Sequence, residues 1–235
     1  MGPSLGTNLR MWDNQLALAD RIRLVRFDHR GHGDSQTPPG PYEIADLGQD
    51  VLDLIDALEA QRASYCGLSL GGMVGMWLGV NAPERLDRLI LLCTAAHMPP
   101  ASAWQERAAA VLKARSTEPI CDAVVDRWLT PPFAAAHPEV RADLRAMLVA
   151  SPSAGYAWCC GAIERMDLRA DLPRIQAPTL VISGSEDLAT PVDRQREIAQ
   201  KIPGARHEIV GPAAHVAAVE QPDEVNRLIA QHLLG

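Results

Sequence analysis

The chain has 235 residues, of which 47% are hydrophobic and 22% are charged. This length and composition predict one folded hydrophobic core, and they exclude disordered, collagen-like and coiled-coil proteins. The 22 Lys and Arg residues against 29 Asp and Glu residues give a net charge of −7 without any basic block. We therefore expect neither a nucleic-acid partner nor binding to an anionic membrane.

The longest aliphatic run, Leu89–Cys93, is far shorter than the roughly 20 residues that a membrane helix needs. The first ten residues lack the charged-then-apolar order of a secretory signal, so a cytoplasmic protein is expected. The five cysteines are odd in number and scattered, which predicts buried free thiols and no metal site.

Helical and strand patterns alternate through the first hundred residues. In chain order they predict a helix over about Leu9–Asp20, a strand over Arg21–Asp28, a helix over Leu47–Leu58, a strand over Ser64–Leu68, a helix over Gly71–Val80 and a strand over Leu86–Thr94. Because successive strands are joined by helices, the pattern favours an α/β fold with parallel pairing.

This order stops after Pro100 and resumes near Ala177. Between them the chain predicts only helices, separated by proline-containing breaks. Beyond them come a strand over Ala177–Gly184, a helix near Val192–Lys201, a strand near Arg206–Val210 and a final helix to Leu234. We interpret residues 99–170 as a helical cap inserted into a core formed by residues 1–98 and 171–235.

The predicted cap is rich in aromatic residues. The chain contains only ten, and half of them lie in the cap: Trp104, Trp128, Phe133, Tyr156 and Trp158. Any one of these residues is more simply a packing anchor than a ligand contact. A cap that roofs a pocket would use them for both purposes, and we expect Trp128 to face a substrate there.

A Gly-x-Ser-x-Gly pentapeptide, Gly67–Gly71, lies where a predicted strand ends and a helix begins. A serine on such a sharp turn exposes its hydroxyl group, and small flanking residues let the strand and the helix approach closely. Ser69 is therefore the candidate nucleophile. The simpler alternative is a glycine-rich turn with a capping serine.

A serine nucleophile needs a base and an acid that orients the base. His137, His207 and His232 are more simply surface or packing residues, whereas His215 follows the last predicted strand in a loop, at the edge where parallel sheets bind ligands. Asp187, after the strand that ends at Gly184, is the candidate acid, and its neighbour Glu186 is the rival. The order Ser69, Asp187, His215 is that of α/β-hydrolases.

Taken together, these segments resemble α/β-hydrolases and, among them, the 3-oxoadipate enol-lactonases of the β-ketoadipate pathway. The resemblance is carried by SLGTNLRMW at 4–12, DHRGHGDS at 28–35, GLSLGGM at 67–73, DRWLTP at 126–131 and the segments around Asp187 and His215. It implies an α/β-hydrolase fold with a mostly parallel sheet and a helical cap. No phosphate-binding Gly-x-Gly-x-x-Gly follows a strand and no His-Glu-x-x-His is present, so we expect an enzyme without a cofactor or metal.

The resemblance assigns further roles. The backbone N–H groups of Leu70 and Leu5 would form the oxyanion hole. The loop that contains His29 and His32 would be structural, which we favour over a metal site because a turn already explains its glycines. Arg127 beside Trp128 is a candidate partner for a substrate carboxylate.

Relatives carry additional residues before the 4–12 segment that supply the first strands, so those strands are expected to be missing here.

Three functions remain open. The first is enol-lactone hydrolysis, and the second is a different reaction of the same triad, which could be ester hydrolysis, a perhydrolase-like reaction or carbon–carbon bond hydrolysis. The third is non-catalytic binding of a small molecule. The sequence does not specify an oligomeric state.

Overall fold

The structure is a computed structural model that describes residues 1–235. Its centre is a parallel sheet in the order β1-β2-β3-β4, made of β1 (Ala63–Leu68), β2 (Leu86–Leu92), β3 (Thr179–Gly184) and β4 (Arg206–Val210). The sheet order follows the chain order although a long helical segment lies between β2 and β3. The predicted α/β class and parallel pairing are thus confirmed.

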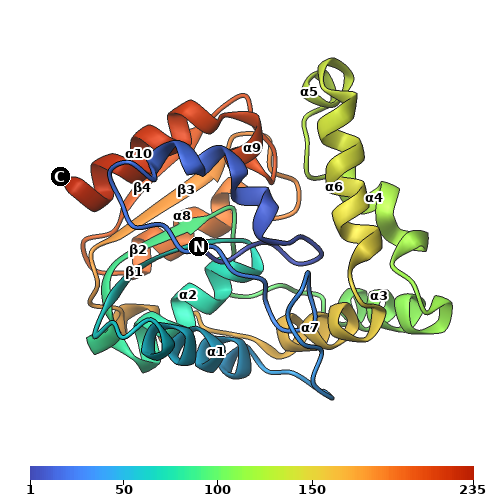
Figure 1. The fold of residues 1–235 in the computed structure, drawn as a ribbon, viewed down its shortest axis with the longest axis horizontal. Helices are drawn as coiled ribbons and strands as arrows, with labels where there is room; N and C mark the ends of the chain where they lie inside the picture. The colour runs from blue at the N-terminus through green and yellow to red at the C-terminus, as the bar shows by residue number, and fades with distance from the viewer.

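Helices cover both faces of the sheet (Figure 1). The core helices are α1 (Ile44–Ala57), α2 (Leu70–Asn81), α8 (Val192–Lys201), α9 (Ala217–Glu220) and α10 (Pro222–Leu234), with 3-10 helices η1 (Leu9–Leu18), η2 (Pro83–Arg85) and η4 (Leu172–Arg174). On one side, α10 lies beside η1, whereas α1 and α2 lie on the other (Figure 1). Because both faces are covered, Leu89–Leu92 and Leu180–Ile182 are fully buried and form the centre of the core.

The predicted strand over Arg21–Asp28 is wrong, because this segment forms no strand in the structure. A strand requires a hydrogen-bonded neighbour, and this segment pairs with no strand but lines, together with residues of β1, a cavity of about 500 Å³. Apolar side chains line the cavity, among them Ile22, Leu24, Phe27 and Tyr65. The alternating pattern therefore marks a segment with a half-buried apolar face that lacks a pairing partner.

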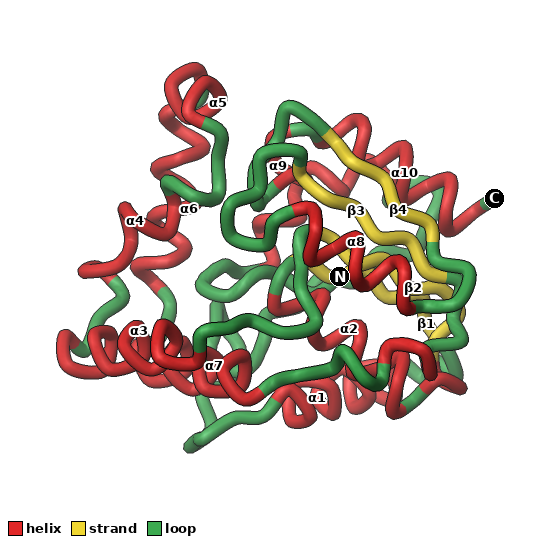
Figure 2. Tube along the Cα trace, turned by 180° about the vertical axis from the view of Figure 1, so that it is seen from behind, coloured by secondary structure: helices red, strands yellow, loops and turns green.

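Apart from η4, the helices between β2 and β3 stand to one side of the sheet (Figures 1 and 2). They are α3 (Ala101–Ala114), η3 (Glu118–Ile120), α4 (Cys121–Val125), α5 (Pro131–Ala136), α6 (Pro138–Ala150) and α7 (Ser153–Arg165). All of them lie within the predicted cap. The division of the chain into a core and a cap stays our interpretation.

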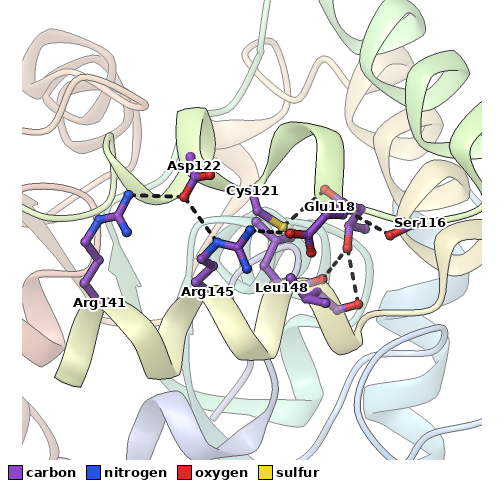
Figure 3. A network of polar contacts seen from close by, with 9 residues as sticks. Ser116, Glu118, Cys121, Asp122, Arg141, Arg145 and Leu148 are labelled. Carbon is purple, nitrogen blue, oxygen red and sulfur yellow. Dashed lines mark hydrogen bonds and ion pairs between the residues drawn. The ribbon is translucent and has the colours of Figure 1, made fainter. Parts of the chain in front are cut away.

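Ion pairs join the helices of the cap to one another (Figure 3). Arg141 on α6 contacts Asp122 at 3.3 Å and Asp126 at 2.8 Å, and Arg145 contacts Asp122 and Glu118. The carboxylates are exposed and the arginines are half-buried, so each pair contributes at most about 1 kcal/mol to stability. Their effect is to fix the position of α4 against α6.

All five cysteines are free and buried, as the sequence predicts. No single helix has the length and apolar content needed to cross a membrane. One bent pair, α6 with α7, meets those criteria by length and composition alone.

Candidate active site

Ser69 stands at the junction of β1 and α2 in a strained backbone conformation, with φ 57° and ψ −113°. Hydrogen bonds on both sides hold it there: its N–H donates to the Leu92 carbonyl at 2.9 Å, and its carbonyl accepts from the Thr94 hydroxyl at 2.7 Å. A positive φ in a non-glycine residue costs free energy and persists only when the surroundings enforce it. The turn is therefore built to present the serine side chain.

The two glycines of the motif allow this turn because their neighbours approach very closely. A Cβ atom on Gly67 would lie 2.2 Å from the Gly71 carbonyl oxygen, and one on Gly71 would lie 2.1 Å from the Gly2 carbonyl oxygen. Both distances are far below van der Waals contact. Alanine at either position would move β1, α2 or the N-terminal segment away from Ser69.

His215 and Asp187 come together as the sequence predicts. His215 Nδ1 lies 3.0 Å from Asp187 Oδ2, and both side chains are almost completely buried. Asp187 also accepts hydrogen bonds from the N–H groups of Ala189 and Thr190 and from the Thr190 hydroxyl. The rival carboxylate, Glu186, is exposed to solvent.

Burial by itself would raise the pKa of Asp187. The neighbouring His215 and the hydrogen bonds from His215 and Thr190 outweigh burial, so the pKa of Asp187 lies below its ordinary value. The carboxylate therefore stays ionised near neutral pH, where it can orient His215 and stabilise a positive charge on the ring.

Ser69 and His215 line the same small cavity, of about 70 Å³, below the cap. Its wall is mainly apolar and includes Leu5, Met73, Trp128 and Ile163. Neither the Leu5 amide nor the Leu70 amide has a hydrogen-bond acceptor within the protein. Two N–H groups beside the serine thus remain available to a developing oxyanion.

The two histidines of the 28–35 loop hold the loop that contains Leu5. His32 Nε2 accepts from the Gly6 N–H at 2.9 Å, and His29 Nε2 lies 3.2 Å from the Pro3 carbonyl oxygen. Because an N–H can only donate, His32 Nε2 must be unprotonated and the ring neutral. The histidines act on the candidate oxyanion loop through its backbone.

Burial lowers the pKa of His29 to about 3 and the pKa of His32 to about 4. An unfolded chain binds protons at these residues below its ordinary pKa of about 6.5, while the folded chain does not. The stability that they contribute is therefore complete above pH 6.5 and is lost as the pH falls from 6.5 to about 4 for His32 and to about 3 for His29.

We expect His32→Gln, which keeps an acceptor for Gly6, to weaken this pH dependence. Between pH 6.5 and 4.5 the wild type should lose about 2 kcal/mol more of its free energy of unfolding than the variant. Urea unfolding at several pH values measures this difference. Parallel curves for the two proteins would show that His32 does not carry the effect.

Two arginines face the cavity from the cap. Arg127, just after α4, and Arg107, on α3, both line it together with Trp128, and Arg107 also stacks over the Trp104 ring at 4.7 Å. Burial and the like charge of Arg107 lower the pKa of Arg127. Unlike Arg141 and Arg145 in Figure 3, neither has a carboxylate partner within the protein.

Sequence reasoning selected Arg127 and Trp128 but missed Arg107. The available signal was the spacing of Trp104 and Arg107, which places the two side chains on one face of a helix. It also missed Glu220, whose buried carboxylate contacts both the cap and the His215 loop.

The parallel sheet, the strained serine turn and the His215–Asp187 pair define an α/β-hydrolase. The family model for the α/β hydrolase fold matches residues 3–222, and this chain belongs to that family. We conclude that it is a hydrolase.

Among similar proteins, the 3-oxoadipate enol-lactonase 2 of Acinetobacter baylyi is 40% identical over 96% of this chain and 84% of its own length. The enol-lactonase structure from Burkholderia xenovorans LB400 is 39% identical with a TM-score of 0.96, and covers all of this chain and 90% of that one. A hydrolase structure from Pseudomonas aeruginosa PA01 is 44% identical with a TM-score of 0.96, over all of this chain and 88% of that one.

Proposed function

We propose that this hydrolase opens 3-oxoadipate enol-lactone to 3-oxoadipate, as part of the degradation of aromatic compounds by the β-ketoadipate pathway. The observation that carries the substrate class is the pair of arginines without carboxylate partners, which line the same small, mainly apolar cavity as Ser69. A compact lactone ring fits apolar walls, and its carboxylate fits a guanidinium. The names of the two enol-lactonase relatives support this assignment.

In the proposed reaction Ser69 Oγ attacks the ring carbonyl carbon while His215 takes the hydroxyl proton. The Leu5 and Leu70 amides stabilise the oxyanion, and the ring C–O bond then breaks to release an enolate, which remains attached to the acyl group. An enolate is a good leaving group, so it needs little help from an acid. Water, activated by His215, hydrolyses the acyl-enzyme, and the enol becomes the ketone of the product.

Turnover of enol-lactone compared with p-nitrophenyl acetate tests this function. We expect kcat/KM for the lactone to exceed that for the neutral ester by at least about 100-fold, because only the lactone offers a carboxylate to the arginines. A preference for the neutral ester would instead favour a general carboxylesterase.

The arginine pair provides a sharper test. Arg127→Ala and Arg107→Ala should each lower kcat/KM for the anionic lactone by roughly 1.5–3 kcal/mol, or about 10- to 150-fold. The same variants should leave hydrolysis of p-nitrophenyl acetate within about twofold of the wild type. Lys113→Gln, which removes an exposed positive charge from the same helix, α3, is the matched control.

Equal losses on both substrates would mean that the arginines only pack the cap. Unchanged kinetics on both would mean that the lactone carboxylate binds elsewhere in the cavity.

A further inference from the structure

We propose that Glu220 is a positioning residue that couples the cap to the candidate base, His215. This inference rests on the proposed hydrolytic triad but does not depend on which ester is cleaved. Glu220 ends α9 and is 6% exposed, and it forms no ion pair with any cation of the protein. A buried carboxylate without a cation is costly unless hydrogen bonds satisfy it.

Its hydrogen bonds come from two parts of the molecule. Oε1 accepts from the Thr130 N–H at 2.9 Å and from the Thr130 hydroxyl at 2.8 Å, and Thr130 belongs to the cap. Oε2 accepts from the Ala214 N–H at 2.5 Å, and Ala214 immediately precedes His215. One side chain therefore connects the cap to the loop that carries the base.

A second link runs in parallel. The Val216 N–H, on the other side of His215, donates to the Trp128 carbonyl at 3.1 Å. His215 is thus flanked by two residues whose amides reach the cap, one directly and one through Glu220. Because Trp128 and Arg127 line the cavity from the same cap segment, a shift of that segment on substrate binding would reach the His215 loop.

The three contacts also constrain the charge of Glu220. Two of them come from backbone N–H groups, which can only donate, and the third is the Thr130 hydroxyl, which donates to Oε1. The ionised form satisfies every one. Because the Glu220 carboxylate contacts Ala214, the residue before His215, its negative charge would stabilise the protonated ring that forms when Ser69 gives up its proton.

Other ionisable groups surround His215. Asp187 contacts Nδ1 of His215. The cavity that His215 lines also contains Ser69 and the positively charged Arg107 and Arg127. The thiol of Cys93 is buried near Asp187. Burial raises the pKa of Cys93 well above its ordinary value, so this thiol stays neutral. A change at Glu220 therefore alters the negative charge near His215 while these groups are kept.

Glu220→Gln tests the proposal, because an amide fills the same space without the charge and turns one acceptor into a donor. We expect kcat for p-nitrophenyl acetate to fall about 10- to 100-fold. The acid limb of the pH–rate profile should move to lower pH by about half a unit or more, because protonated His215 loses a neighbouring anion. A purely structural role would lower the melting temperature and leave this limb in place.

Two further variants complete the experiment. Thr130→Val removes the cap hydroxyl but keeps the charge, so KM for the lactone should rise at least about threefold while the acid limb stays fixed. This variant tests the coupling even when Glu220→Gln fails to fold. Glu224→Gln removes an exposed carboxylate from the neighbouring α10 and should leave kcat, KM and the acid limb unchanged.

Labelling of the wild type by a fluorophosphonate separates the two proposals, since an unlabelled protein would refute the Ser69 triad itself. If the wild type is labelled and neither Glu220→Gln nor Thr130→Val changes kinetics beyond the loss of folded protein, the positioning role is overturned.

Discussion

Replacing Ser69 with alanine is expected to lower kcat/KM for enol-lactone by about 10⁴-fold or more. The serine oxygen forms the covalent bond in the proposed reaction, and without it only the oxyanion amides and substrate binding remain to assist attack by water. Steady-state kinetics on purified protein measures the loss. Retention of a tenth of the wild-type activity would show that another residue is the nucleophile.

Two controls make this experiment specific. Ser102→Ala changes an exposed serine at the start of α3 and should leave activity unchanged. A fluorophosphonate probe should label the wild type and Ser102→Ala on Ser69 and should leave Ser69→Ala unlabelled. Alanine should leave the strained backbone conformation at position 69 almost unchanged, because the main-chain atoms of residue 69 make the hydrogen bonds to Leu92 and Thr94.

The candidate triad could be predicted because its residues follow strands. In a parallel sheet the carboxyl ends of all strands meet at one edge, so local patterns after β1, β3 and β4 were sufficient to place Ser69, Asp187 and His215 together. The choice of Asp187 over Glu186 also follows from local position, since the structure buries the first and exposes the second.

Other features depend on partners distant in the sequence, and local patterns do not contain that information. From the sequence, Glu220 is indistinguishable from an ordinary charged residue at the end of a helix, yet it contacts Thr130, which lies 90 residues away in the sequence. The sequence pattern predicts Arg107 to be a solvated residue on an exposed helix, whereas in the structure it lines the cavity. The strand expected at Arg21–Asp28 failed for the same reason, because alternation does not reveal whether a neighbouring strand exists.

Asp187→Asn is expected to lower kcat by about 10³- to 10⁴-fold while leaving the fold intact, and the hydrogen bonds around Asp187 explain why. Oδ1 accepts from two backbone N–H groups, those of Ala189 and Thr190, so the amide oxygen of asparagine must take that position. The amide nitrogen then occupies the place of Oδ2, 3.0 Å from His215 Nδ1.

An amide nitrogen can only donate, so it forces Nδ1 of His215 to become the acceptor. The ring proton then lies on Nε2, and the ring can no longer take the proton of Ser69.

Glu186→Gln removes the neighbouring exposed carboxylate and should change kcat less than about twofold, which makes it the matched control. Circular dichroism and thermal unfolding of both variants establish that the loss is catalytic. A large effect at Glu186 together with a small effect at Asp187 would transfer the role of the acid to Glu186, in spite of the contact between Asp187 and His215.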